Sequence, residues 1–219
     1  MFFSFKGPLV GLPAFFYNRF GVKINILFFR FLEILLYDYL KEAERVLDVG
    51  TGPGHFPIII GRIYNNLEIY GIDPADNMIS EAMRNLKKSG LKNIHFLKGD
   101  SARIDFPSEY FDVVTSNFSI KHWENQKEGL KEIFRVLKKG GIVWIVDVSK
   151  NFDPKMLYDF IPLVSFGYKI LFFPVLKFFM PKIGISADEM NNLISGIGFR
   201  GSFRDSPYLP FTYALLKKP

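Results

Sequence analysis

Short apolar segments alternate with longer amphipathic segments through the middle of the chain. The short segments predict buried strands at 45–50, 67–73, 93–100, 111–119 and 142–148. Between the second and third of them, residues 74–90 repeat apolar side chains at spacings of three and four, which predicts one buried helix face. Strands that alternate with helices are typical of a parallel sheet covered on both faces. Because crossover connections are right-handed, the pattern predicts an α/β fold with a doubly wound, mostly parallel sheet.

Local signals indicate where several helices begin and end. Asp73 is suited to cap the helix that follows the second strand, and Gly90 is suited to end it. A helix with a lysine-rich end and a glycine stop is expected over 125–141. Ser186, followed by Glu189 three residues later, forms the pattern of a capping box and predicts a further helix start.

The sequence predicts a single domain over residues 1–219, with two apolar regions outside the alternating pattern. Residues 24–40 predict a helix with a broad buried face, within an N-terminal helical cap over 1–44. The segment 151–185 is rich in phenylalanine, with lysines and prolines between, and we interpret it as an apolar lid inserted into the domain. Two last strands that would close the sheet are expected near 199–205 and 210–217.

Composition and charge narrow the chemistry. The chain has no cysteine, which excludes disulfides, thiolate metal ligands and a cysteine nucleophile. Its three histidines lie far apart without metal-ligand spacing, so no metal site is predicted. Of the net charge of +6, residues 161–219 carry +4, whereas residues 45–160 are almost neutral. A neutral centre makes nucleic acid an unexpected partner, because phosphate contacts require clustered positive charge.

The apolar termini raise the question of membranes. No positive region precedes the apolar N-terminus and no uninterrupted apolar run could span a bilayer, so we expect neither a secretory leader nor a membrane span. A cytoplasmic protein is predicted. The segment 160–180 mixes lysines with phenylalanines, so we expect it to contact a bilayer surface or a lipid-like substrate, unless its phenylalanines simply complete the core.

Three glycines follow the first predicted strand at alternating positions, Gly50, Gly52 and Gly54. Glycine permits positive φ and lets a ligand approach the backbone, and the helix that follows offers free N–H groups. In an open parallel sheet, ligands bind at the carboxyl ends of the strands, where this turn lies. The turn therefore predicts a nucleotide-like site, although the same glycines would also suit a tight turn without a ligand.

Two acids at the ends of later strands favour the binding interpretation. Asp73 ends the second strand, where an acid can accept hydrogen bonds from both hydroxyls of a ribose. Asp100 follows the third strand and could accept from the amino group of an adenine. The G-x-G-x-G spacing, with Asp48 two residues ahead, differs from the dinucleotide fingerprint. An acid at that position suits a positively charged partner, such as an amino group.

Residues 45–148 resemble the class I S-adenosylmethionine-dependent methyltransferases, in particular the branch with ubiquinone and menaquinone methyltransferases. The resemblance rests on four segments in the family's order: LDVGTGPGHF, IYGIDPADNMISEAMRN, IHFLKGDSARIDFPSEYFDVVTSNFSIKHW and GLKEIFRVLKKGGIVWIVDV. It implies a Rossmann-like, seven-stranded sheet that ends in an antiparallel C-terminal hairpin. It also implies S-adenosyl-L-methionine as cofactor and S-adenosyl-L-homocysteine as product.

The resemblance implies roles for single residues. Those around Asp48 would face the methionine part of the cofactor, and Asp73 would hold the ribose. Asn117 and Phe118 would lie near the sulfonium. Tyr17 would close over the cofactor carboxylate, although a buried tyrosine in an apolar helix explains it as well. The implied cofactor-binding residues are Tyr17, Asp48, Gly50, Thr51, Gly52, Asp73, Pro74, Met78, Asp100, Ser101, Asn117 and Phe118.

The implied reaction is methyl transfer by direct displacement, which mainly requires alignment of the acceptor with the methyl group. A catalytic base is needed only where the acceptor holds its proton tightly, and His122 is the candidate, more as a pocket-lining residue than as a base. Trp123 is expected to pack and Asp147 to hydrogen-bond structurally. The apolar lid predicts a small, apolar or lipid-like acceptor. The alternatives are a catalytically silent cofactor-binding or interaction module of the same fold and an RNA methyltransferase.

Overall fold

The computed structural model describes residues 22–151, 184–207 and 209–219, with side chains from residue 29 onward. Almost all of the expected lid over 151–185 lies outside these residues, as does the first half of the expected N-terminal cap. Tyr17 and the segment 160–180 lie outside them as well. The described residues contain the whole alternating part of the chain.

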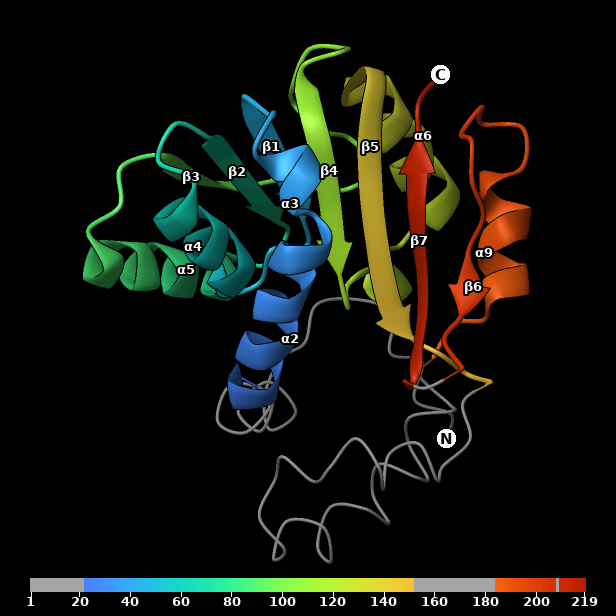
Figure 1. Cartoon of the computed structure of the whole chain (residues 1–219), viewed down its shortest axis with the longest axis horizontal. Helices are drawn as coiled ribbons and strands as arrows, with labels where there is room; N and C mark the ends of the chain where they lie inside the picture. Colours follow the sequence, from blue (N-terminus) through green and yellow to red (C-terminus); the bar gives the residue numbers. More distant parts are fainter. Residues whose placement is uncertain (1–21, 152–183, 208) are drawn as a thin grey trace, which may run out of the picture.

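Strands and helices alternate along the described chain as the apolar pattern predicts (Figure 1). The strands are β1 Arg45–Val49, β2 Glu68–Asp73, β3 Ile94–Lys98, β4 Phe111–Asn117, β5 Leu137–Val148, β6 Arg204–Asp205 and β7 Phe211–Lys217. The helices are α2 Val22–Leu35, α3 Tyr37–Leu40, α4 His55–Ile63, α5 Asp76–Ser89, α6 Gln126–Val136 and α9 Ala187–Ile194, with a 3-10 turn, η2, at Ile120–His122.

The seven strands form one sheet in the order β3-β2-β1-β4-β5-β7-β6. All neighbouring strands from β3 to β5 pair in parallel, whereas β7 pairs antiparallel with both β5 and β6. Figure 1 shows the arrowheads of β4 and β5 at one edge of the sheet and that of β7 at the other. The α/β fold, with its mostly parallel sheet and antiparallel C-terminal strands, is therefore confirmed.

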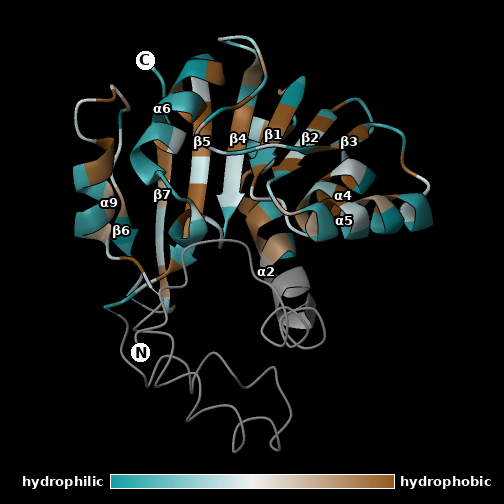
Figure 2. Ribbon diagram, turned by 180° about the vertical axis from the view of Figure 1, so that it is seen from behind, coloured by the Kyte–Doolittle hydropathy of each residue, from teal (hydrophilic) through white to brown (hydrophobic). Residues whose placement is uncertain are grey.

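The core lies on both faces of the sheet, because alternate residues of each strand point to opposite sides. On one face, residues such as Leu47 and Val49 of β1 pack with α6 and α9. On the other face, Val46 of β1 packs with side chains of α2 to α5. Figure 2 shows the strands largely in the apolar colours and the outer sides of α6 and α9 in the polar ones. The helix layers therefore explain why β1 is a nearly continuous apolar run.

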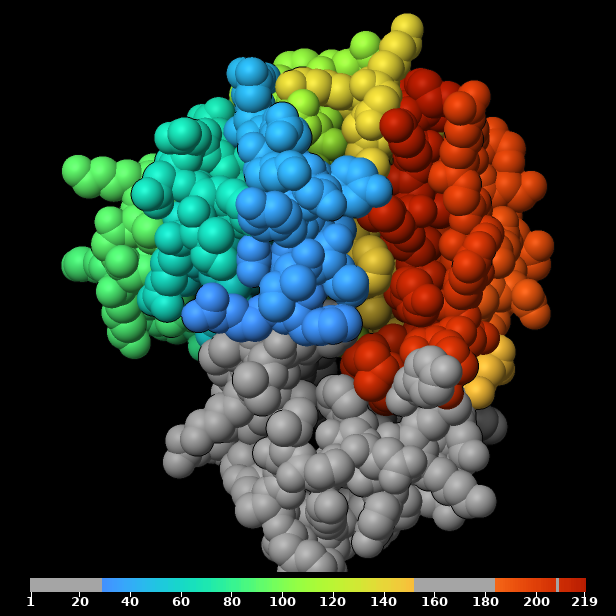
Figure 3. All heavy atoms as spheres, in the orientation of Figure 1, coloured from blue at the N-terminus to red at the C-terminus, as the bar shows by residue number. Residues whose placement is uncertain are grey.

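Helices α2 and α3 lie over the middle of the sheet, between α4 and β7 in the view of Figure 3. Two contacts hold α2 against α4. The rings of Phe29 and Phe56 have centroids 5.6 Å apart. The Tyr64 hydroxyl, just after α4, donates to the buried Glu33 carboxylate of α2 over 2.7 Å. The described part of the N-terminal cap therefore packs on the helix that follows the glycine turn.

The helix ends follow some of the local signals and contradict others. Gly90 ends α5 in the left-handed conformation, and the Ser186–Glu189 capping box begins α9, as predicted. The predicted helix 125–141 is too long, because α6 ends at Val136 and β5 begins at the next residue. Lys138 and Lys139 therefore belong to β5. Leu137 pairs with Phe111 at the start of β4, and this strand pairing ends the helix.

Two further expectations need correction. Asp73 does not cap α5: the cap residue is Ala75, and Asp73 accepts the backbone N–H of Ala75 over 2.9 Å. The other oxygen of the Asp73 carboxylate accepts the N–H of Gly52 in the glycine turn, so both oxygens bond to backbone groups outside α5. The predicted helix 24–40 is divided at Leu36, whose ψ of 2° departs from helical geometry and separates α2 from α3.

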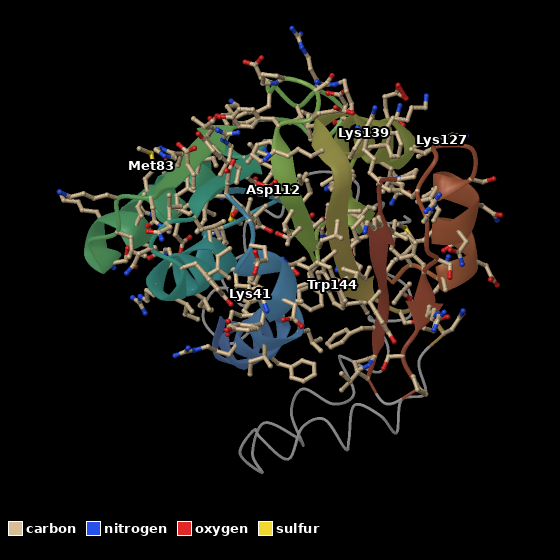
Figure 4. All side chains as sticks on the ribbon, turned by 45° about the horizontal axis from the view of Figure 1, so that its top comes forward. Lys41, Met83, Asp112, Lys127, Lys139 and Trp144 are labelled. Carbon is tan, nitrogen blue, oxygen red and sulfur yellow. The ribbon has the colours of Figure 1, made fainter. Side chains whose placement is uncertain are left out.

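Asp112, which is labelled in Figure 4, lies at the start of β4 and bonds to the beginnings of β1 and β5. Its carboxylate accepts the N–H groups of Glu44 and Arg45 over 3.0 and 2.9 Å and pairs with Lys138 Nζ over 2.6 Å. Burial alone would raise the pKa of Asp112, but the Lys138 ammonium and the two N–H groups lower it below its ordinary value. This edge of the sheet, opposite the glycine turn, is therefore stabilised by a charged aspartate.

We predict that Asp112→Asn lowers the free energy of unfolding at pH 7 by about 1–3 kcal/mol, through loss of the charge-assisted bonds. Because the folded-state pKa is depressed, this contribution is present above the ordinary aspartate pKa and lost as the pH falls through the folded-state value. Urea unfolding at pH 7 and pH 3 measures it. The exposed Asp105→Asn is the control. Equal stability of Asp112→Asn and wild type at pH 7 would contradict the assignment.

Candidate functional site

The glycine turn between β1 and α4 has the geometry of a backbone binding loop. Gly50, Gly52 and Gly54 all have positive φ, and Gly54 precedes α4 directly. A Cβ on Gly50 would lie 2.3 Å from Ser119 Oγ, and one on Gly54 would lie 2.3 Å from the Phe96 ring. Packing alone therefore requires these two glycines. Gly52 differs, because no atom of the described residues, its own chain neighbours apart, lies within 4 Å of the place its Cβ would occupy, so its outer side is open there.

Asp48 lies at the end of β1, almost completely buried. Its Oδ1 accepts hydrogen bonds from Thr115 Oγ1 over 2.7 Å and from Asn117 Nδ2 over 3.2 Å. Burial raises the pKa of Asp48 to about 6, against the lowering effect of these hydrogen bonds. Among the described residues, no cation forms an ion pair with it. The site therefore holds a buried carboxyl group that a positively charged ligand would stabilise in its ionised form.

Asp73 lies at the end of β2 and is oriented by two backbone groups. Its Oδ2 accepts the N–H of Gly52 over 3.0 Å, and its Oδ1 accepts that of Ala75 over 2.9 Å. Burial raises its pKa, while the two N–H groups act in the opposite direction. The glycine turn and the acid after it are thus one hydrogen-bonded unit. A carboxylate has about four lone-pair sites, so two remain for hydroxyl donors.

The residues expected near an adenine lie along the ends of β2 and β3. Pro74 is exposed, and Met78 forms a small buried cluster with Ala75, apart from the two main core clusters. Asp100 is exposed and its Oδ1 accepts the N–H of Ala102 over 2.8 Å, whereas Ser101 is buried. The structure therefore places these residues after neighbouring strand ends, with Asp100 turned toward its own loop.

Asn117 ends β4 and Phe118 follows it, beside the glycine turn. Asn117 Nδ2 donates to Asp48, but its Oδ1 is buried and has no hydrogen-bond partner among the described residues. Phe118 has a φ of +58°, unusual for a residue with a side chain, and its ring contacts Phe211 edge-on with centroids 5.3 Å apart. Strained backbone of this kind occurs frequently at functional sites.

The remaining predicted site residues have different outcomes. His122 ends η2 and is partly buried, with its backbone N–H bonded to the Ser119 carbonyl. Trp123 is buried, as expected of a packing residue. Asp147 is buried and ion-paired with Lys121, in agreement with its expected structural role. Tyr17 lies outside the described residues. Within the described ranges, no group of three or more metal-ligating side chains was found.

Sequence reasoning missed two residues that shape the site. Thr115 holds Asp48, and Ser119 donates to the Val49 carbonyl over 3.0 Å while lying against Gly50. Thr115 alternates with Asn117 on β4, so period-two reading of that strand could have found it. Ser119 had no local signal, because its role depends on the approach of β1 and β4.

The polar groups of the site fit the methionine end of S-adenosylmethionine. A ligand ammonium could donate to Asn117 Oδ1, which has no partner in the described part of the chain, and neutralise the buried Asp48 charge. Open space beside Gly52 permits close approach to the backbone. Asp73 retains acceptor sites for ribose hydroxyls. One ligand therefore supplies the ammonium group for Asp48 and Asn117 and the hydroxyl donors for Asp73.

We predict that Gly52→Ala lowers the affinity for S-adenosylhomocysteine at least tenfold, because the added methyl group occupies the open side of the turn. Gly90→Ala is the matched control, because Gly90 also has positive φ and, among the described residues beyond its chain neighbours, no atom within 4 Å of its Cβ position. Each change should cost about 1–2 kcal/mol of stability, from the left-handed conformation. Calorimetric titration compares the two variants, and equal affinities would contradict a ligand at Gly52.

We also predict that S-adenosylhomocysteine binds more weakly as the pH falls from 7 to 5. Below the Asp48 pKa of about 6, the empty site holds a neutral carboxyl group, and the ligand ammonium prefers the carboxylate. The raised pKa also affects folding. The contribution of Asp48 to the free energy of unfolding of the ligand-free protein decreases as the pH rises from about 4 to about 6.

Calorimetry between pH 5 and pH 8 tests the binding prediction, with Asp48→Asn as control. The variant should bind more weakly at pH 8 and show a flatter pH profile. A wild-type dissociation constant that stays the same from pH 7 to pH 5 would show that Asp48 does not titrate on binding.

The chain is similar to known methyltransferases. A family model described as a methyltransferase domain matches residues 40–164, more than half of the chain. The chain is 31% identical to the ubiquinone/menaquinone biosynthesis C-methyltransferase UbiE of Vibrio vulnificus over 123 residues. This alignment covers 54% of this chain and 47% of UbiE. It is 28% identical over 167 residues to a demethylmenaquinone methyltransferase of Bacteroides fragilis, covering 72% and 68%. The chain therefore spans about half the length of UbiE.

Solved structures show the same fold. A SAM-dependent methyltransferase from Aquifex aeolicus superposes with a TM-score of 0.64 at 23% identity, over 84% of this chain and 87% of that one. The [4+2]-cyclase SpnF superposes with a TM-score of 0.66 at 17% identity, over 87% and 80%. Since a protein named as a cyclase shares the fold, the fold alone does not set the reaction. The family match contains the glycine turn and continues through β5, so the chain belongs to the class I S-adenosylmethionine-dependent methyltransferase family.

Proposed function

We propose that the protein transfers a methyl group from S-adenosylmethionine to a small, apolar, lipid-like acceptor. The observation that carries the proposal is the pair of Asp48 and Asn117 beside the glycine turn. Within the ranges that the structure describes, Asp48 is a buried acid without a cation, and Asn117 Oδ1 is a buried acceptor without a donor. Burying such groups is costly unless a ligand completes their interactions, and an ammonium group does so for both.

The chain's own residues bind and orient the cofactor in this proposal. When bound, S-adenosylmethionine supplies a methyl group on a positively charged sulfur. Asp48 and Asn117 hold its amino group, Asp73 accepts from the ribose, and Met78 packs beside the adenine. Phe118 and His122 lie on the turn after β4 and face the acceptor, with His122 as a lining residue. Such fixed alignment is the main contribution that an enzyme makes to a direct displacement.

We propose a reduced quinone ring as the acceptor class. The names of the relatives support it, since UbiE is a ubiquinone/menaquinone biosynthesis C-methyltransferase and others are demethylmenaquinone methyltransferases. A described surface also supports an apolar partner. The outward side of α2 and the start of α3 exposes large apolar side chains, which we call the α2–α3 patch: Phe31, Ile34, Leu35 and Tyr37.

The test is transfer of labelled methyl from S-adenosylmethionine to chemically reduced 1,4-naphthoquinone, with and without a prenyl side chain. We expect label in the organic phase for the wild type, with faster transfer to the prenylated acceptor. Asp73→Ala should weaken binding of S-adenosylhomocysteine by about 1–3 kcal/mol, by loss of charge-assisted bonds, whereas Asp105→Asn should not.

Other outcomes of this experiment identify the alternatives. Binding of S-adenosylhomocysteine without transfer to either quinone or to a lipid extract would indicate a catalytically silent module. Label in RNA, lost steeply with added salt, would indicate an RNA methyltransferase. Absence of S-adenosylhomocysteine binding at high micromolar concentration would overturn the proposed function altogether.

Peripheral membrane contact is part of the proposal. No helix among the described residues is long and apolar enough to cross a membrane. The lysines and phenylalanines of 160–180, together with the α2–α3 patch, support contact with an anionic surface. We expect the protein to sediment with phosphatidylglycerol-containing vesicles at low salt and Ile34→Ser to reduce this without lowering the melting temperature. Equal sedimentation with neutral and anionic vesicles would argue against the charge contribution, and no sedimentation with either would overturn the contact.

A further inference from the structure

A buried ion pair joins the turn after β4 to the end of β5. Lys121 Nζ and Asp147 Oδ1 are 2.6 Å apart, and only 12% and 1% of the two side chains are exposed. Asp147 Oδ2 also accepts the backbone N–H of Lys121 over 3.2 Å. The Asp147 carboxylate therefore binds both the side chain and the backbone N–H of Lys121. These two contacts hold the turn against the end of β5.

The turn that this pair holds carries the acceptor side of the proposed site. It begins at Phe118, whose backbone has a φ of +58° and whose N–H donates to the Val146 carbonyl over 2.8 Å. Ser119 fastens the same turn to β1 through the Val49 carbonyl, and His122 follows Lys121 directly. The strained start of the turn requires that the surrounding contacts over-determine its position.

Stability alone does not account for a charged pair at this place. Burying two charges costs free energy that their attraction only partly returns, and apolar residues of similar size frequently stabilise a fold as well or better. A second pair, Lys138–Asp112, also joins β4 and β5 with a 2.6 Å contact, but at the opposite edge and with 30% and 25% of the side chains exposed. The more deeply buried pair is the one that lies beside the site.

We propose that Lys121 and Asp147 are positioning residues, which hold the 118–122 turn so that the acceptor lies in line with the methyl group. The inference rests on the proposed function. Asn117 belongs to β4 and is bonded to Asp48, so its position does not depend on the turn. Loss of the pair should therefore reduce the rate of transfer while leaving cofactor affinity nearly unchanged.

The first test follows the turn itself and requires no turnover. The chain has two tryptophans, and Trp123 Nε1 donates to Ser119 Oγ, so Trp123 reports on the turn. Trp144 Nε1 is buried and has no partner among the described residues, so Trp144→Phe is a suitable background that leaves no described group unsatisfied. In this background, Lys121→Met/Asp147→Asn should at least double the acrylamide quenching of Trp123. The control Lys138→Met/Asp112→Asn should leave quenching unchanged.

The second test measures catalysis with prenylated naphthohydroquinone. The Lys121→Met/Asp147→Asn variant should lose about 10–100-fold in kcat, because small misplacements have effects of this size. Its affinity for S-adenosylhomocysteine should stay within threefold of wild type. The single variant Lys121→Arg keeps a positive charge beside Asp147 and should retain most of kcat. The Lys138→Met/Asp112→Asn control should retain kcat despite its lower stability. If the double variant does not fold, Lys121→Gln replaces it with the same readouts.

The outcomes separate this inference from the proposed function. Unchanged Trp123 quenching in a folded Lys121 variant would overturn the positioning role, whatever the activity. Wild-type kcat in that variant would overturn it as well. If the wild type transfers no methyl group to the quinones while quenching rises as expected, the acceptor assignment fails and the structural part of the inference stands.

Discussion

The burial of β1 on both faces is the constraint on which the rest of the structure depends. β1 lies between β2 and β4, and Val46 and Leu47, on its two faces, are completely buried. A strand in this position offers no solvent to a charged side chain, yet it carries Asp48. The carboxyl group is retained by hydrogen bonds from β4, and burial raises its pKa to about 6. The unfavourable burial of the charge is what makes a cationic ligand favourable there.

The two ends of the sheet use polar groups differently. At the amino ends of the strands, Asp112 has a lysine and two backbone donors, and its pKa is lowered. At the carboxyl ends, Asp48 and Asp73 have raised pKa values, and an acceptor atom of Asn117 has no donor in the described part of the chain. The satisfied Asp112 carboxylate supports the fold, whereas the incompletely satisfied groups of Asp48 and Asn117 support the proposed ligand site.

Much of the site could be predicted because its backbone requirements appear in the local sequence. Three glycines with positive φ and acids at strand ends are local signals, and Asp73 was predicted from them, although its role as a helix cap was not borne out. Thr115 and Ser119 could not be identified as members of the site in this way. Each contacts β1 across about 70 residues of sequence, and neither belongs to a motif with a required spacing.

The sequence by itself determined the alternation of strands and helices, the double burial of the central strands and the glycine turn, because each depends on side-chain periodicity or local backbone freedom. Only the tertiary structure decided the end of α6, since pairing of Leu137 with the start of β4 overrode its helical pattern. It also decided which strands became neighbours. Asp48 and Thr115 are 67 positions apart and bond only because β4 lies beside β1. Strand order is a property of the packed sheet as a whole, and no local pattern encodes it.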